Sequence, residues 1–400
     1  MLSKKQISSC LLLKNYCERH NFSGWDPYDG LNSKLFQNLP LKNWDLARLA
    51  WIQGFKRLPI NLRSLVLVSK GHNAKGIGLF LSAYCNLYKR QNYHYDNLFG
   101  TSIELMNRII DLASILESLK STGYSGACWG YNFDWQARGG LFFPAGTPNV
   151  VATTFATFGL LDAYDVTGNQ KYLDTAISSA HFVTQDLNRS IRTDGSFLFS
   201  YAPLPGNNNV YNASLLGSKL LARVYSYTCA PDILDPAAKS VQACLSAQEV
   251  DGSWNYGELT IQNWKDSYHT GFNLVSMYEY RKFTGDDSVN VAINKGLHFY
   301  LNNFFLDDGT PKYYHNNTYP IDIHSPAQLL VTLSRLNIYD KNRDFALKVL
   351  DWTIANMQHP SQGYFYYQLK KVLSSKIPYM RWNQAWMLYA FTLILEQESK

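Results

Sequence analysis

The 400-residue chain carries little charge and has no long run of either sign. Charged residues make up 17% of the sequence and hydrophobic residues 46%, a balance that favours a large folded core and excludes a disordered protein. The formal net charge of +6 is spread along the chain without a long basic run. Because nucleic-acid-binding and membrane-surface proteins cluster their lysines and arginines, both classes are disfavoured.

Long apolar runs are also absent. In the N-terminal segment, only Leu11 to Leu13 form an apolar run, which is shorter than the core of a signal peptide. The longest apolar stretch, Ala385 to Leu395, is about half as long as a membrane span. The six cysteines form no Cys-x-x-Cys pair and have no histidine at metal-ligand spacing. These features predict a cytoplasmic protein with reduced thiols, no integral membrane segment and no metal.

The sequence lacks the common motifs for cofactor binding and nucleophilic catalysis. It contains no phosphate-binding loop with Lys-Ser/Thr, no Gly-x-Gly-x-x-Gly, no His-Glu-x-x-His and no Gly-x-Ser-x-Gly. The segment from Lys70 to Gly78 is rich in glycine but has none of these spacings. We therefore expect no cofactor.

Aromatic residues are abundant, and many of them carry a polar group. The chain has 10 Trp, 28 Tyr and 21 Phe. Tyrosine and tryptophan pair an apolar ring with a hydrogen-bonding group, which suits a hydrated binding groove better than a dry core.

A short pattern of a glycine followed by aromatic residues at alternate positions recurs five times. Successive glycines are 65, 57, 57 and 54 residues apart. The alternation predicts short extended segments with one face buried. The glycines are Gly130, Gly195, Gly252, Gly309 and Gly363.

Two helical patterns follow each of the first four of these segments, and one follows the fifth. The first pattern is apolar and rich in small residues; it covers residues 149–167, 212–228, 267–284, 325–339 and 381–397. The second is amphipathic; it covers residues 171–187, 233–248, 288–304 and 343–358. One further pair lies upstream, at 75–90 and 102–120.

The helices predicted over 3–20 and 381–397 have no partner in this scheme, and six hairpins close into a ring if these two pack together. The sequence therefore predicts an all-α fold, a two-layered ring of about twelve helices. No linker-like segment divides the chain, so residues 1–400 are expected to form a single domain. Residues 22–63 are the least regular part, expected as loop plus short helix over one mouth of the ring.

In such a ring the inner helices direct their N-termini at one mouth. Asparagine and aspartate are ordinary helix caps, but histidine and arginine oppose the positive end of the helix dipole, so their presence indicates ligand contacts. The polar residues at these predicted starts are Asn149, Asn212, Asp266, His269, Asp322, His324 and Arg381.

Three acidic residues are candidates for acid and base catalysis. Asp134 lies between aromatic residues, and its partial desolvation would suit a general acid; an ion pair with Arg138 that fixes a loop is the alternative. Glu258 and Asp266 form a second acidic cluster. Glycoside cleavage usually uses two carboxylates.

A second polar and aromatic cluster runs from Trp25 to Ser33. Asp26 and Asp29 lie beside aromatic rings, as in a sugar-binding subsite, although Pro27 and Gly30 are also typical of an Asx-rich turn. We expect Trp25 to line the mouth, together with Trp135 and Trp254.

These motifs resemble the six-hairpin glycosidase-like superfamily, whose fold is the (α/α)6 toroid. Within it, the sequence is similar to uncharacterised proteins of bacterial surface-polysaccharide biosynthesis clusters. The resemblance implies a carbohydrate-active protein with an oligosaccharide or polysaccharide substrate, without nucleic acid, and in association with polysaccharide assembly enzymes. The motifs are Gly24-Trp-Asp-Pro-Tyr-Asp-Gly-Leu-Asn-Ser33, Phe133-Asp-Trp-Gln136, Gly146-Thr-Pro-Asn-Val150, Asp266-Ser-Tyr-His-Thr-Gly-Phe272, His324-Ser-Pro-Ala327 and Tyr379-Met-Arg-Trp-x-Gln-Ala-Trp386.

The segment from Gln248 to Trp254 is also similar to the Gln-Trp repeat of triterpene cyclases. The Asp-x-Asp-Asp motif of those enzymes is absent, and so is the zinc-ligand spacing of protein prenyltransferases. We interpret this segment as a structural turn.

Three functions follow as hypotheses. The leading one is a glycoside hydrolase in which Asp134 and Asp266 form the carboxylate pair, with Glu258 as a substitute. The second is a uronic-acid lyase or C5-epimerase, in which Tyr268 or His269 removes a proton. The third is a non-catalytic glycan-binding or assembly scaffold. The predicted substrate-binding residues are Trp25, Asp26, Asp29, Tyr131, Trp135, Arg138, Asn149, Asn212, Trp254, His324 and Arg381.

Overall fold

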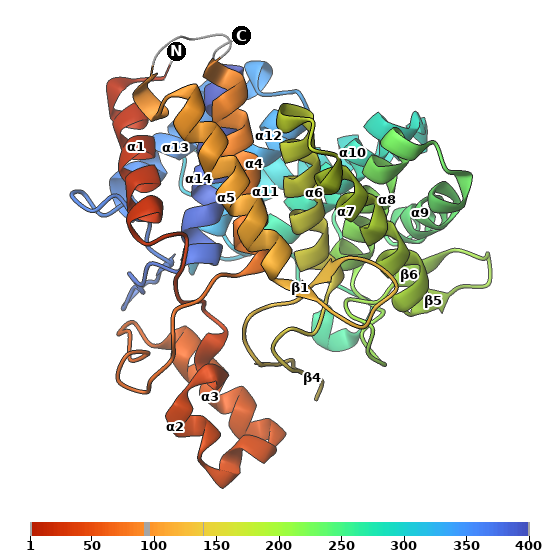
Figure 1. Ribbon diagram of the computed structural model, residues 1–400, viewed down its shortest axis with the longest axis horizontal. Coiled ribbons are helices and arrows are strands. Elements are labelled where there is room, and N and C mark those ends of the chain that lie inside the picture. Colours follow the sequence, from red (N-terminus) through yellow and green to blue (C-terminus); the bar gives the residue numbers. More distant parts are fainter. Residues whose placement is uncertain (1, 92–96, 139, 399–400) are drawn as a thin grey trace.

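The computed structural model describes residues 2–91, 97–138 and 140–398. Its helices run in roughly parallel directions (Figure 1) and pack as an inner and an outer layer. The inner helices are α4 (Ala74–Gln91), α6 (Val150–Thr167), α8 (Tyr211–Thr228), α10 (Ser267–Thr284), α12 (His324–Arg335) and α14 (Trp386–Gln397). The outer helices are α5 (Ser102–Ser118), α7 (Gln170–His181), α9 (Pro231–Leu245), α11 (Asn290–Asn303), α13 (Arg343–Met357) and α1 (Lys4–Arg19). Each inner helix packs on the next and α14 packs on α4, so the predicted all-α ring is confirmed.

The N-terminal helix completes the last hairpin. Helix α1 packs on both α13 and α14, and its own side chains Cys10, Leu13 and Cys17 are buried. The Gln6 side-chain amide donates to Asp351 of α13 at 2.9 Å. The prediction that the first and last helices close the ring is therefore confirmed, and the start of α1 lies near the end of α14 in Figure 1.

Turns between inner and outer helices follow the sequence signals. Helices α6 and α10 end at Gly168 and Gly285, which both adopt left-handed backbone conformations that glycine tolerates best. The next residues, Asn169 and Asp286, accept hydrogen bonds from the backbone of the following turn. A glycine that ends one helix and an Asn or Asp that caps the next turn therefore determine these two connections.

The recurring glycines lie where the loops cross the outer helices. A Cβ atom at Gly252, Gly309 or Gly363 would lie about 3 Å or less from atoms of α11, α13 and α1 respectively, which only glycine avoids. Upstream, a Cβ at Gly126 would overlap Ser178 of α7, and a Cβ at Gly130 would overlap the backbone of Gly146 and Thr147. At Gly252, Gly309 and Gly363 the repeat thus reflects close packing of the loop on an outer helix, whereas at Gly195 no atom would lie within 4 Å of a Cβ and the left-handed φ of +80° favours glycine.

Short antiparallel strand pairs lie at the end of the ring where the inner helices begin (Figure 1), and the segments after Gly130, Gly195 and Gly363 each contribute one strand. The paired strands are β1 (Lys120–Ser121) with β2 (Cys128–Trp129), β3 (Trp135–Gln136) with β4 (Phe142–Phe143), β5 (Arg189–Ile191) with β6 (Phe197–Phe199), and β7 (Ile321–Asp322) with β8 (Gln368–Leu369). We call this end of the ring the mouth.

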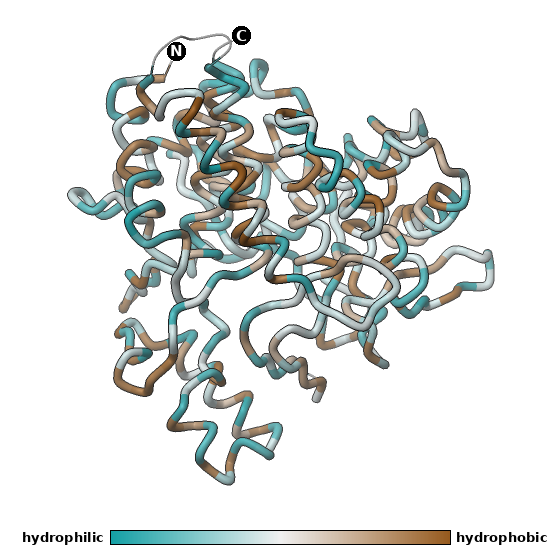
Figure 2. The backbone as a smooth tube through the Cα atoms, viewed as in Figure 1, coloured by the Kyte–Doolittle hydropathy of each residue, from teal (hydrophilic) through white to brown (hydrophobic). Residues whose placement is uncertain are grey.

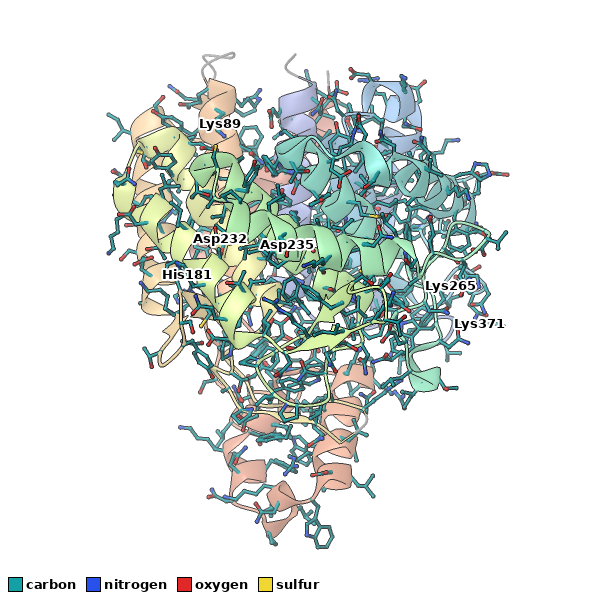
Figure 3. All side chains as sticks on the ribbon, turned by 90° about the vertical axis from the view of Figure 1, so that its right-hand side faces the viewer. Lys89, His181, Asp232, Asp235, Lys265 and Lys371 are labelled. Atoms are coloured by element: carbon teal, nitrogen blue, oxygen red, sulfur yellow. The ribbon has the colours of Figure 1, made fainter. Side chains whose placement is uncertain are left out.

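An appendage projects from the mouth (Figures 1 and 3). It contains α2 (Lys34–Gln37) and α3 (Asp45–Arg57), flanked by 3-10 turns at Asp29–Asn32 and Pro40–Asn43. Leu31, Phe36 and Ile52 form a small core of their own. The segment is thus more helical than the sequence predicted. No helix of the described residues is long and apolar enough to span a bilayer.

Polar side chains from all six inner helices meet inside the ring. Arg223 is 2.7 Å from Asp162, and Glu279 is 2.8 Å from Lys219 and 3.7 Å from Arg335. The connecting members are Ser82 of α4, which donates to Asp162 at 2.5 Å, and Tyr389 of α14, which accepts from Arg335 at 2.9 Å. We call this group the axial ion network.

The charges of the axial ion network compensate one another. Burial opposes ionisation of Asp162, but Arg223 and Arg335 outweigh it and lower its pKa to about 2. Burial likewise opposes ionisation of Glu279, whose pKa is nevertheless lowered by Lys219 and Arg335. A lowered carboxyl pKa contributes stability that is present at neutral pH and is lost as the pH falls from about 4 towards 2.

We predict that Glu279→Ala destabilises the protein by about 3–5 kcal/mol, because it leaves the buried Lys219 and Arg335 without their carboxylate. Chemical denaturation at neutral pH measures this free energy of unfolding. Asp344→Ala removes a fully exposed carboxylate of α13 and should change it by about 0.5 kcal/mol or less. Equal effects of the two substitutions would show that the network does not stabilise the ring.

Candidate active site

Titratable side chains gather at the mouth, where several inner helices begin. They come from α4, the β2–β3 loop, α10, α12 and the turn before α14, with one residue from the segment that leads into the appendage. We call them the central cluster; its members are Asp26, Lys75, Tyr131, Asp266, Tyr268, His269, His324 and Arg381.

Asp266 caps α10 and orients His269. One carboxylate oxygen accepts from the His269 backbone N–H at 2.9 Å, and the other lies 2.7 Å from Nδ1 of the same residue. Since a carboxylate only accepts, Nδ1 carries the hydrogen and Nε2 is left as the acceptor. Asp266 is buried, whereas the His269 side chain is 18% exposed. A helix cap therefore also fixes the tautomer of a partly accessible imidazole.

His324 begins α12 and is completely buried. Its ring stacks on Tyr268, with centroids 4.4 Å apart and planes at 10°. Neither ring nitrogen has a hydrogen-bond partner among the described residues. Burial, assisted by the nearby charge of Lys75, lowers the pKa of His324 well below its ordinary value. This imidazole is neutral at physiological pH.

Lys75 was not singled out by the sequence, although it lies in the glycine-rich segment before α4. Its Nζ lies 4.8, 5.1 and 5.3 Å from the ring centroids of Phe155, Phe272 and Trp386. No hydrogen bond or ion pair of Nζ occurs in the part of the chain that the structure describes. Burial, and then the charge of Arg381, lowers its pKa strongly. A buried amine without an acceptor is costly unless a ligand provides one.

Arg381 and Asp26 form a buried bidentate ion pair. Nε and Nη2 of Arg381 lie 2.5 and 2.8 Å from the two carboxylate oxygens, and the guanidinium stacks 5.0 Å from the Tyr131 ring. A hollow of about 10 Å³ adjoins the pair, close to the least volume that holds one water. Asp29 pairs with buried Arg63 at 2.6 Å, and burial raises its pKa to about 6.

Asp322 is a buried carboxylate that precedes α12. It accepts from the His324 backbone, from the Trp382 indole at 2.9 Å and from Gln368 at 2.6 Å. Burial raises its pKa to about 6. The sequence placed Asp322 at a helix start but offered no signal of its desolvation.

Tyr28 connects the appendage to the mouth. Its hydroxyl accepts from Lys56 of α3 at 2.6 Å, and its ring lies 5.7 Å from Trp382 and 6.4 Å from Trp135. Tyr28 thereby lies beside Trp382, in the turn before α14.

Two of the predicted acids lie in other environments. The Asp134 carboxylate accepts from the Ala145 backbone at 2.8 Å and from Gln37 at 3.4 Å. It forms no ion pair with Arg138 within the described ranges, and Arg138 is exposed. Glu258 pairs with Arg192 at 2.6 Å in a loop outside the central cluster. The carboxylates of Asp134, Glu258 and Asp266 thus each have different partners.

Several predicted binding residues have packing or capping roles. Trp254 is buried against α11 and donates to the Cys244 carbonyl at 2.9 Å, so this indole belongs to the core. Asn149 caps α6 through the backbone of Ala152. Asn212 is buried in α8, and its amide nitrogen has no partner among the described residues.

Two predicted tryptophans lie nearer the mouth. Trp25 donates to the Val68 carbonyl at 2.9 Å, and its ring lies 4.8 Å from Nζ of Lys70. Trp135 stacks on Phe143 at 4.9 Å. Both indoles are half-buried. Among the residues that the structure describes, no group of three or more His, Cys, Asp and Glu side chains is placed to hold a metal ion.

No protein-family profile matches this sequence, and no curated protein sequence matches it. Solved structures do match. A cellobiose 2-epimerase from Bacillus thermoamylovorans superimposes with a TM-score of 0.62 and 13% identity, over 82% of this chain and 88% of the epimerase. A family 76 α-mannanase from Bacteroides thetaiotaomicron gives 0.61 and 15%, over 82% and 86%.

An unsaturated glucuronyl hydrolase specific for heparin gives a TM-score of 0.58 at 14% identity, over 81% of this chain and 86% of the hydrolase. These similarities extend over most of each chain, and at such low identity they show a shared architecture. The chain therefore shares the (α/α)6 toroid fold with these structures.

Proposed function

We propose that this protein is a carbohydrate-active enzyme of the epimerase type, which removes a proton from a sugar carbon next to a carbonyl or carboxylate and returns it to the opposite face. The observation that carries this proposal is the pair of imidazoles at the mouth. The His269 and His324 rings lie 4.0 and 4.4 Å from the Tyr268 ring.

The structural comparisons support the substrate class. The three similar structures are, by their names, a cellobiose 2-epimerase, an α-mannanase and a glucuronyl hydrolase. All three names denote enzymes of carbohydrates, but they cover different reactions. The reaction proposed for this chain therefore rests on its own side chains.

Removal of a carbon-bound proton needs a neutral base, and return of a proton needs an acid on the other face. His324 supplies the neutral imidazole. His269, protonated at Nε2, supplies the acid, because Asp266 accepts from its Nδ1–H and balances the charge of the protonated ring. In the reverse direction the two imidazoles exchange roles.

Proton removal also leaves negative charge on the substrate oxygen, which needs stabilisation by fixed positive charge. Lys75 and Arg381 both lie close enough to His324 to contribute to its lowered pKa. An anionic oxygen near Lys75 would supply the acceptor that its Nζ lacks. The cluster thus pairs a neutral imidazole with the Arg381 guanidinium and with the Lys75 amine, whose charged form a substrate anion would favour.

Glycoside hydrolysis is the second candidate, and Asp322 favours it. A buried carboxyl group with a pKa of about 6 retains part of its proton near neutral pH and suits a general acid. Asp134 and Asp266 remain the predicted carboxylate pair for this reaction. We place hydrolysis second because the Asp266 carboxylate is bound by His269 and the Asp134 carboxylate accepts from Ala145 and Gln37, whereas the imidazole of His324 has no such partner among the described residues.

The proposal predicts exchange of a sugar C–H hydrogen with solvent. Incubation in deuterium oxide with cello-oligosaccharides and uronic-acid oligosaccharides should give deuterium at one carbon, measured by NMR. His269→Asn and His324→Gln should each slow this exchange by about 100-fold or more, because each removes one of the two proton carriers. His298→Gln alters an exposed histidine of α11 and should leave the rate unchanged. Release of new reducing ends without deuterium incorporation would contradict the epimerase proposal and favour the hydrolase.

Two carboxamide substitutions separate the candidates. Asp266→Asn keeps the helix cap, since asparagine caps well, but it removes the carboxylate that orients His269. We expect it to lower kcat by about 100-fold or more with a small change in KM. Asp134→Asn should leave epimerisation intact.

A hydrolase that uses Asp134 and Asp266 requires both variants to lose turnover. Circular dichroism and Tm of both variants control for folding. Normal deuterium exchange by the Asp266→Asn variant would show that His269 is not the proton carrier.

A further inference from the structure

Positive charge is concentrated in two segments that are far apart in the sequence. Residues 46–95 and 352–395 together contain 12 of the 37 lysines and arginines and none of the 31 acidic residues. The remainder of the chain is therefore net negative. Neither segment has a long basic run, which explains why the charge looks evenly spread in the sequence.

The fold brings parts of these segments together beside the mouth. The Lys370 ammonium donates to the Arg57 carbonyl at 3.0 Å. The buried guanidinium of Arg63, fixed by its ion pair with Asp29, lies 4.8 Å from the Tyr379 ring. The loop over 57–67 thus lies against the loop over 370–376. Partial burial, followed by the charges of Arg57 and Lys56, lowers the pKa of Lys370, as expected where cations crowd together.

Large aliphatic side chains are exposed on the same two loops. Val372 is 93% exposed and Leu65 73%, and Ile60, Leu67 and Leu373 are each more than half exposed. Figure 2 shows hydrophobic colouring on both loops, on one side of the molecule next to the appendage, and Lys371 lies at the edge of the molecule in Figure 3. We call this surface the basic–leucine face; its residues are Arg57, Ile60, Leu65, Leu67, Lys370, Lys371, Val372, Leu373 and Lys376.

We propose that the basic–leucine face docks the protein on an anionic lipid bilayer. Aliphatic side chains at loop tips insert into the acyl boundary, while neighbouring lysines extend their ammonium groups to the anionic headgroups. The absence of acidic residues from both loops removes the repulsion that such a surface would otherwise meet. Each cation near an anionic membrane strengthens binding about fivefold.

A lipid surface fits this face better than a protein partner does. Protein interfaces rely on tryptophan, tyrosine and arginine anchors seated in pockets, whereas this face presents valine, leucine and isoleucine on two projecting loops. Docking here would place the bilayer beside the mouth, because Lys56, which holds Tyr28, immediately precedes Arg57 of the face. The proposal does not depend on which reaction the central cluster catalyses.

Vesicle flotation of the full-length protein tests the proposal. We expect binding to vesicles rich in phosphatidylglycerol, little binding to pure phosphatidylcholine, and weakening at high salt. Lys371→Gln with Lys376→Gln should weaken binding about 25-fold. Val372→Asp with Leu373→Asp should abolish it. The matched control, Val291→Asp with Lys295→Gln, changes exposed residues of α11 and should bind like the wild type.

Three results would overturn the proposal. The first is absence of flotation with anionic vesicles, and the second is equal binding by the face variants and the wild type. The third is a dimer in sedimentation velocity that the Val372→Asp, Leu373→Asp variant converts to a monomer, which would make the face an interface between copies of this chain. Unchanged Tm values of the variants establish that each result reports on the surface and not on folding.

Discussion

Closure of the inner helices around buried charge is the constraint on which the rest of the structure depends. Six helices around a common axis leave a central space, and each helix contributes side chains to it from one face only. Here Asp162, Arg223, Glu279 and Arg335 fill part of it as compensating ions, which are stable in a low-dielectric interior only when their geometry is mutually satisfied. The network therefore favours the arrangement in which all six helices are present.

The mouth differs from the axial ion network in how its charges are partnered. In the network each carboxylate lies beside a cation. In the central cluster, the ring nitrogens of His324 have no hydrogen-bond partner among the described residues, and Nζ of Lys75 lies among aromatic rings, although both side chains are buried. Unpaired buried groups reduce stability and occur mainly where a ligand completes them. This contrast, within one ring, is the physical reason for placing the chemistry at the mouth.

The appendage relates the mouth to the surroundings of the molecule. Three side chains between residues 24 and 73 contact the mouth. Asp26 forms an ion pair with Arg381, the Tyr28 ring contacts Trp382, and the Arg63 guanidinium lies over the Tyr379 ring. The same segment carries much of the exposed aliphatic surface. Few side chains therefore separate the appendage from the central cluster.

Local patterns in the sequence determined the helical hairpins. Apolar periodicity predicted the inner and outer helices, and Gly168 with Asn169 predicted the turn between two of them. Both signals are local, because helix period and capping depend on residues a few positions apart. The same signals located Asp266, His269, His324 and Arg381 at helix starts that face one mouth.

Only the tertiary structure decided which of these side chains meet and which are desolvated. Lys75 and Arg381 are about 300 residues apart, and the ring places their charges close enough to interact. The sequence suggested that Trp254 and Glu258 belong to the mouth as well. Trp254 is instead in the core, and Glu258 pairs with Arg192 outside the central cluster. Proximity across a closed ring and the burial of a charge depend on the packing of the whole chain, which no local spacing encodes.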